Sequence, residues 1–182
     1  MVTTGAKDQR GLSVGSADSG AADLRGQFID AMAANSTSVH VVTTADSETA
    51  MGVTVSACNS VCADPPTLLV CINTRSPACR AVDANGVFAV NLLSAEQRHI
   101  ADTFAGRAVK SKPFDFACCD WTHGVLGVPL IKGAVASLEC RVVGQQTVGT
   151  HCVFFGEVVA LEIAQHTPLL YCRRDYGRFQ PL

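Results

Sequence analysis

The segment SLECRVVGQQTVGTHCVFFGEVVALEI, residues 137–163, indicates the type of fold. Its β-branched and aromatic residues predict two long strands, joined through a turn at Gly144-Gln145-Gln146. Consecutive strands joined by a short turn pair in the antiparallel sense. The segment therefore favours an antiparallel sheet over a doubly wound sheet of alternating strands and helices.

The remainder of the chain adds further strands and a few short helices. Strands are predicted at SVHVVTTA (38–45), MGVTVSAC (51–58), TLLVCIN (67–73), VFAVNLL (87–93) and PLLYC (168–172). The continuous apolar run at 67–73 predicts a strand buried on both faces. In MGVTVSAC, the residues Val53, Val55 and Ala57 should face one way and Thr54, Ser56 and Cys58 the other. This order predicts a mostly β protein, a closed or partly closed antiparallel barrel with peripheral helices.

Three helices are marked by their capping residues. Asp23 should cap a helix over Leu24–Ala34, and Ser76 with Pro77 should open one that Gly86 ends. Ser94 and Gln97 form a capping box for a helix that ends near Gly106. Residues 1–22, rich in Gly, Ser, Ala and Asp, are predicted to be a flexible tail, and residues 23–182 form one domain.

Composition excludes several classes of protein. The chain has 182 residues, of which 48% are hydrophobic and 16% charged, so it is globular. A net charge of -2 argues against a nucleic-acid-binding protein. No signal peptide and no apolar run long enough to span a bilayer are apparent, which predicts a cytoplasmic protein without a membrane partner.

The nine cysteines are an odd number without a regular framework. Cys58 and Cys62 are separated by three residues, and Cys71 lies beyond two prolines, unlike the paired ligands of structural zinc sites. We therefore interpret the cysteines as reduced, mostly buried thiols and predict no metal.

Two neighbouring segments could hold a ligand. The segment Thr54–Ser60 presents hydroxyl, thiol and amide groups without a carboxylate, as either a bed for a planar heterocycle or a half-exposed strand edge. Asn73–Pro77 lies between a buried strand and a helix start, where free amides and Arg75 suit a phosphate. Because no G-x-G-x-x-G joins a strand to a helix, a Rossmann nucleotide site is disfavoured.

His151 and the C-terminal YCRRDYGRF leave two readings open as well. An isolated histidine at a strand start is either a ligand-facing group or a surface or core residue. The aromatic and arginine residues of 171–179 form either a solvated tail or a lid over a ligand.

Six stretches, in order, carry a resemblance to a known family: GVTVSACNSV, PPTLLVCINTRSPA, FAVNLLSAEQ, FAGR, GTHCVFFGEV and PLLYCRRDYGRF. The chain resembles the short-chain flavin reductases, the FMN-binding split-barrel family. Within it, the chain is most similar to the reductase components of two-component monooxygenases of phenols, chlorophenols and hydroxyphenylacetate. The resemblance implies a Greek-key split β-barrel, a homodimer with flavin near its interface, and NADH as electron donor.

The resemblance also implies roles for individual residues. Thr54 to Ser60 would line the flavin ring, Asn73 to Ser76 would hold its phosphate, and His151 would place the nicotinamide. The family often has Asp before this histidine, whereas this chain has Thr150. Any role of that carboxylate is therefore not expected here. The implied cofactor contacts are Thr54, Val55, Ser56, Ala57, Asn59, Ser60, Asn73, Arg75, Ser76, Phe104, Ala105, Gly106, His151 and Tyr176.

The expected function is NADH-dependent reduction of diffusible flavin, FAD or FMN, for a partner monooxygenase in aromatic degradation. FAD and NADH are favoured by the resemblance to the phenol reductases and by the lack of a basic cluster for a 2′-phosphate. A flavin carrier or sensor and an oxidase of the pyridoxamine-phosphate type are the alternatives.

Overall fold

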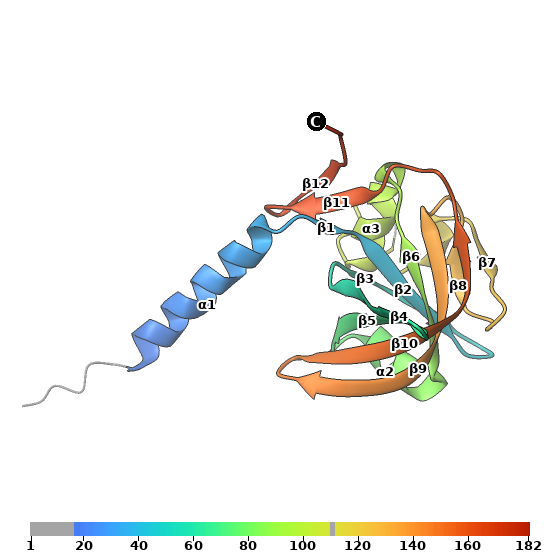
Figure 1. Ribbon diagram of the computed structural model, residues 1–182, viewed down its shortest axis with the longest axis horizontal. Helices are drawn as coiled ribbons and strands as arrows, with labels where there is room; N and C mark the ends of the chain where they lie inside the picture. The colour runs from blue at the N-terminus through green and yellow to red at the C-terminus, as the bar shows by residue number, and fades with distance from the viewer. Residues whose placement is uncertain (1–16, 110–111) are drawn as a thin grey trace, which may run out of the picture.

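A curved antiparallel sheet closes on itself as a partly open barrel (Figure 1). The computed structural model describes residues 17–109 and 112–182, and the side chains from residue 23 onward. In these residues, the main sheet has seven strands in the order β3-β2-β6-β9-β10-β5-β4. The prediction of a mostly β, antiparallel barrel with peripheral helices is confirmed.

The strands of the main sheet are β2 (His40–Ala45), β3 (Ala50–Val55), β4 (Cys58–Ala63), β5 (Pro66–Asn73), β6 (Val87–Leu92), β9 (Ala136–Val148) and β10 (His151–Ile163). A smaller sheet joins β1 (Thr37–Ser38), β11 (Leu169–Cys172) and β12 (Asp175–Arg178), and β7 (Trp121–His123) pairs with β8 (Pro129–Ile131). The helices are α1 (Ala17–Ala34), α2 (Pro77–Asn85) and α3 (Arg98–Phe104), with short 3-10 turns at Ala95–Gln97 and Phe116–Cys118.

The two long strands that indicated the fold pair as predicted, but their turn lies elsewhere. Gly144, Gln145 and Gln146 belong to β9 and pair with β10. The chain turns instead at Gly149-Thr150, where Gly149 has a left-handed φ of 57°. Glycine adopts this conformation without a steric penalty, which favours a turn at this position. The prediction of a turn at 144–146 is therefore wrong, because those residues pair within the sheet.

The strand predicted at 51–58 is interrupted. The chain bends at Ser56-Ala57, where the Cys58 N–H donates to the Ser56 carbonyl at 3.2 Å, and β4 begins at Cys58. Val53 and Val55 share one face as predicted, and they pack in the interior of the barrel, but Cys58 packs in the same interior. The bend therefore resets the alternation, and β4 becomes the edge strand beside β5.

Three buried apolar clusters stabilise the described part of the chain, and the largest fills the barrel. The interior contains Val42, Val70, Phe88 and Phe154, each with a relative exposure of 0%. A second cluster lies between the sheet and α3. Strand β5 contributes alternate buried residues to the interior and leaves the intervening residues partly buried, so the prediction of burial on both faces is wrong.

The helices lie outside the barrel, and the capping residues place them correctly in two cases. Gly86, with φ 65°, ends α2, and the Ser94–Gln97 capping box opens the turn before α3. Helix α1 begins at Ala17, before the predicted cap Asp23, which instead accepts from Gln27 within the helix at 2.7 Å. Of the predicted tail, residues 1–16 lie outside the described residues.

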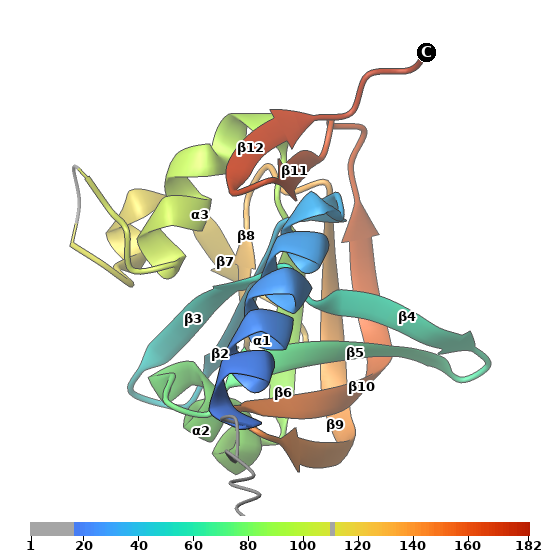
Figure 2. The ribbon, with the colours of Figure 1, turned by 90° about the vertical axis from the view of Figure 1, so that its left-hand side faces the viewer.

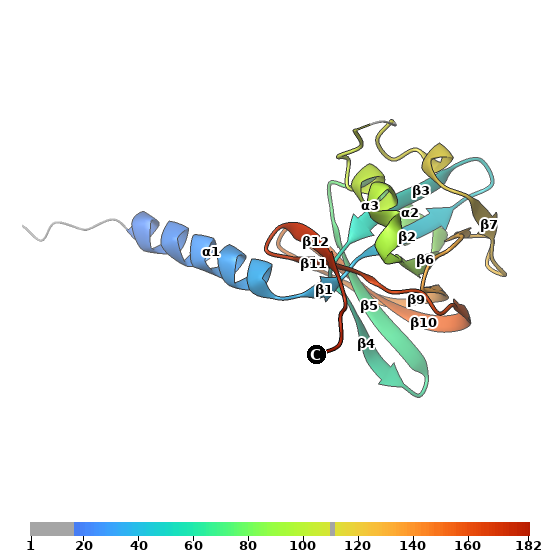
Figure 3. The same cartoon turned by 90° about the horizontal axis from the view of Figure 1, so that it is seen from above.

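Helix α1 and the β4–β5 hairpin both project from the barrel, in different directions (Figures 2 and 3). Near its C-terminal end, the helix contacts the β11–β12 turn, where Arg174 forms an ion pair with Asp30 at 2.8 Å. Among the described residues, none of the helices is long and apolar enough to cross a membrane.

Candidate flavin site

Helix α3 is fixed against β3, and this contact builds one wall of the site. The Thr54 hydroxyl donates to the Ala101 carbonyl at 2.8 Å. Phe104, fully buried, packs so closely over Gly52 that a Cβ there would lie 2.7 Å from its ring. A glycine at this position therefore lets the end of α3, and the loop after it, approach the strand.

An open cavity of about 580 Å³ lies between this wall and the start of α2. It is lined by Val53, Thr54, Asn73, Arg75, Ser76, Pro77, Phe104, Ala105, Arg107 and Phe114. Two arginines and no carboxylate are among these residues. The lining therefore favours an anionic ligand.

The turn before α2 is arranged like a phosphate site. The Asn73 side chain accepts from the Arg75 N–H at 2.9 Å, which shapes the turn. Ser76 occupies the N-cap position of α2, but its hydroxyl makes no capping hydrogen bond. The Ser76 hydroxyl can therefore serve a phosphate, with Arg75 nearby. The prediction of free amides in this turn is wrong, because the N–H groups of Thr74, Arg75 and Ser76 donate within the fold and Pro77 has none.

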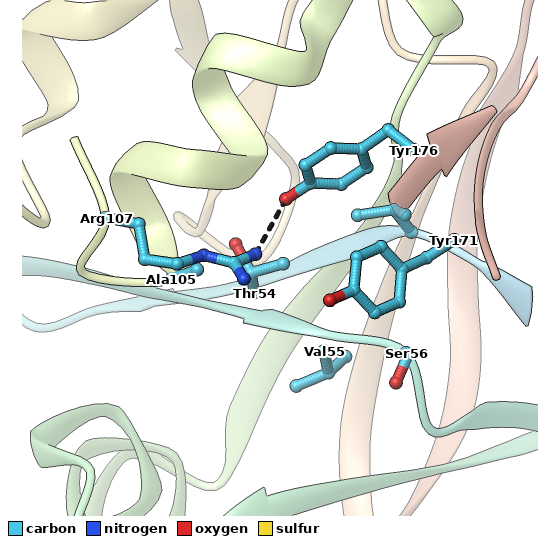
Figure 4. A pocket seen from close by; sticks show the side chains of 8 residues that line it. Thr54, Val55, Ser56, Ala105, Arg107, Tyr171 and Tyr176 are labelled. Atoms are coloured by element: carbon cyan, nitrogen blue, oxygen red, sulfur yellow. Dashed lines mark hydrogen bonds between the residues drawn. The ribbon is translucent and has the colours of Figure 1, made fainter. Parts of the chain in front are cut away.

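A second cavity, of about 160 Å³, adjoins the first and shares Thr54, Ala105 and Arg107 with it (Figure 4). Its other lining residues are Val39, Val55, Ser56, Tyr171 and Tyr176. The lining again lacks a carboxylate, and it combines hydroxyls with apolar surface. An uncharged, planar ring that carries carbonyl groups fits such a surface.

Arg107 is held at the boundary between the two cavities. Its guanidinium donates to the Tyr176 hydroxyl at 3.0 Å, and this hydroxyl donates to Asp102 at 3.1 Å. Burial, and next the negative charge of Asp102, raise the pKa of Tyr176, so the phenol stays protonated and can donate. The ring of Tyr171 packs edge-on against Tyr176, with centroids 5.2 Å apart.

His151 lies at the start of β10, beside the phosphate turn. It pairs with Asn73 across the sheet, and its side chain is exposed. The Thr150 hydroxyl lies 3.0 Å from its Nδ1. Thr150 can therefore orient the imidazole where the family often has an aspartate.

The structure brings most of the expected site residues together. Nine line the two cavities: Thr54, Val55, Ser56, Asn73, Arg75, Ser76, Phe104, Ala105 and Tyr176. Five do not line them: Ala57, Asn59, Ser60, Gly106 and His151. Asn59 and Ser60 lie on β4, an edge strand that pairs with β5.

Several lining residues were missed from the sequence. Arg107 ends the FAGR stretch and had no assigned role, and Tyr171 was included only in the possible lid at 171–179. Phe114 carried no local signal, because its place depends on how α3 and the following loop fold over β3. Asp102 lines neither cavity but accepts from the Tyr176 hydroxyl, and it also carried no local signal.

The cysteines lie away from this chemistry. All nine are free, and burial raises the pKa of Cys58 to about 11 and of Cys140 to about 12. Such thiols stay protonated at neutral pH and pack as small apolar groups. The described residues contain no group of three or more His, Cys, Asp or Glu side chains that could hold a metal.

Comparison with known proteins defines the class to which this fold and site belong. Residues 32–180 match the model of the flavin reductase like domain, and the chain belongs to this family.

Among curated relatives, FMN reductase (NADH) RutF of Ancylobacter novellus is 42% identical over 84% of this chain and 83% of its own. The 4-hydroxyphenylacetate 3-monooxygenase reductase component of Pseudomonas aeruginosa is 37% identical over 84% and 91%.

Solved structures of flavin reductases are similar to this chain as well. Flavin reductase PheA2 superimposes with a TM-score of 0.79 at 31% identity, over 86% of this chain and 98% of that chain. The NADH:FAD oxidoreductase SgcE6 of Streptomyces globisporus, in complex with NAD and FAD fragments, gives 0.78 at 33% identity, over 86% and 93%.

Proposed function

We propose that the protein is an NADH-dependent flavin reductase that supplies reduced flavin to a separate aromatic-compound monooxygenase. The observation that carries this proposal is the pair of joined cavities. The larger is lined by two arginines beside a helix start, and the smaller combines hydroxyls and apolar surface with the shared Arg107 at its boundary. These two parts match the phosphate and the ring of a flavin nucleotide. The relatives named as FMN reductase (NADH) and as a monooxygenase reductase component support the same activity.

The residues of the chain have positioning roles in this proposal. A bound flavin supplies the chemistry by accepting hydride from NADH. Ser76 and Arg75, at the start of α2, would hold its phosphate. Thr54 to Ser56 support its ring, and the absence of a carboxylate there avoids repulsion with the negative charge that reduction creates. His151, oriented by Thr150, places the nicotinamide.

Release of the product follows from the openness of the site. Both cavities open to solvent, and Arg75 and Arg107 are exposed side chains. Ion pairs with exposed groups add modest affinity, so reduced flavin can leave for the oxygenase.

We also propose that the protein is a homodimer. Helix α1 carries an exposed apolar row, with Leu24 at 68%, Phe28 at 63% and Met32 at 51% exposure. A second copy of the chain would bury this row. Sedimentation equilibrium tests the proposal, and a monomer at micromolar concentration contradicts it.

The reduced thiols also support the prediction of a cytoplasmic protein.

One assay separates the proposed function from its alternatives. NADH absorbance is followed with the purified protein, with and without added FAD or FMN. Loss of NADH that depends on added flavin supports the reductase. No loss with either flavin supports a carrier or sensor. A protein that retains FMN through purification and oxidises an amine with oxygen supports the oxidase.

A further inference from the structure

Phe114 is an exposed aromatic residue in the wall of the larger cavity. It is 52% exposed, and it lines this cavity together with Phe104, Arg75 and Arg107. Its backbone has a left-handed φ of 60°, which is strained for a bulky residue. Such strain needs support from the surroundings, and it clusters at ligand sites.

The fold holds this ring in place. The Phe114 N–H donates to the Thr103 carbonyl at 3.1 Å, at the end of α3. The ring packs against Gly106, where an added Cβ would lie 3.0 Å from its Cζ atom. The ring is thus supported on one side, while half of the residue's surface remains open to the cavity and to solvent.

The charges beside Phe114 suit more than one phosphate. Arg75 and Arg107 both line this cavity, each on a different wall. FMN ends at a single phosphate, whereas a dinucleotide carries a diphosphate followed by adenosine. A flat apolar surface in the phosphate-binding cavity, outside the smaller ring-binding cavity, is the surface that a base beyond the diphosphate would need.

From this arrangement, we propose that Phe114 is the stacking surface for the adenine ring of a bound dinucleotide whose diphosphate lies between Arg75 and Arg107. The inference rests on the proposed function and adds a choice of substrate to it. With FAD in the cavity, Phe114 makes the protein prefer FAD to FMN. The same surface could instead receive the adenine of NADH, and the experiment distinguishes the two.

The experiment measures the Kd of FAD, FMN and ADP for the full chain by isothermal titration calorimetry. Phe114→Gly removes the ring and suits the left-handed backbone, so the variant should fold. Phe114→Leu keeps an apolar side chain without a flat face, and Phe114→Trp keeps the flat face. Stacking on one base predicts that Phe114→Gly and Phe114→Leu weaken FAD and ADP binding by about 5- to 150-fold. FMN binding should be unchanged, and Phe114→Trp should bind FAD like the wild type.

The outcomes separate this inference from the function on which it rests. If Phe114→Gly weakens FMN binding as much as FAD binding, or if it leaves ADP binding unchanged, the stacking role is wrong. If Phe114→Gly weakens ADP binding but not FAD binding, the adenine of NADH stacks on Phe114. In that case the KM of NADH should rise in the variant, and the KM of reduced nicotinamide mononucleotide should not. If the wild type binds neither flavin, the proposed function fails, whereas a Phe114-dependent affinity for ADP would still support the stacking surface.

Discussion

His40 should make the protein acid-sensitive near neutral pH. It is the first residue of β2, is only 9% exposed, and faces Val55 and Leu92 on the neighbouring strands. Its Nδ1 is buried without a hydrogen-bond partner. Burial lowers the pKa of His40 from 6.5 to about 4, and an interaction with the Ser38 backbone only partly opposes this shift.

The direction of the effect follows from the two pKa values. Between pH 6.5 and about 4, the unfolded chain binds a proton at His40 that the folded protein does not. Stability is therefore complete above this range and falls as the pH drops through it. The pKa difference corresponds to about 3 kcal/mol in full, of which about 2 kcal/mol is lost between pH 7 and pH 5.

Urea unfolding of the wild type and of His40→Leu at both pH values tests this prediction. The variant has no titrating group at this position, and all other acidic groups are common to both proteins. The wild type should lose about 2 kcal/mol more free energy of unfolding than the variant on going to the lower pH. Equal losses in the two proteins would show that His40 is not buried as a neutral group.

Three further substitutions test the site. His151→Ala should raise the KM of NADH by about 2- to 10-fold, the loss of one hydrogen bond, and leave the Kd of flavin unchanged in a titration; equal losses would refute a nicotinamide role. Arg107→Ala should weaken flavin binding by about 2- to 5-fold, the effect of one exposed ion pair, whereas Arg80→Ala, an exposed arginine on α2, should not; similar behaviour of both would contradict a specific contact. Gly52→Ala should cost about 1–3 kcal/mol in thermal unfolding and weaken flavin binding, because its Cβ would displace Phe104; a neutral result would show that this packing does not position the loop.

The barrel was predictable because its signals are local. Alternating β-branched residues specified most strands, and Gly86 and the Ser94–Gln97 box placed helix ends to within a residue or so. The errors arose where one local signal competed with another. Gly144 resembled a turn, yet its pairing with β10 kept it in the strand, and the left-handed Gly149 made the turn instead.

The site was predictable where it follows the chain and was missed where it does not. The Asn73–Ser76 turn lies directly between a strand and a helix, so its place at a helix start could be inferred from sequence. That its amides are used by Asn73 and Thr150 could not be inferred, because Thr150 meets the turn only through the pairing of β5 with β10. Arg107 and Tyr176 are far apart in the chain, and they meet only because the β11–β12 hairpin folds over the end of α3. Contacts of this kind depend on tertiary packing, which no local pattern encodes.

A crystal structure of the full chain with FAD would show where the flavin binds. We expect the diphosphate between Arg75, Ser76 and Arg107, with the flavin ring over Thr54 to Ser56. Density for flavin at another surface, with both cavities free of it, would contradict the proposed site.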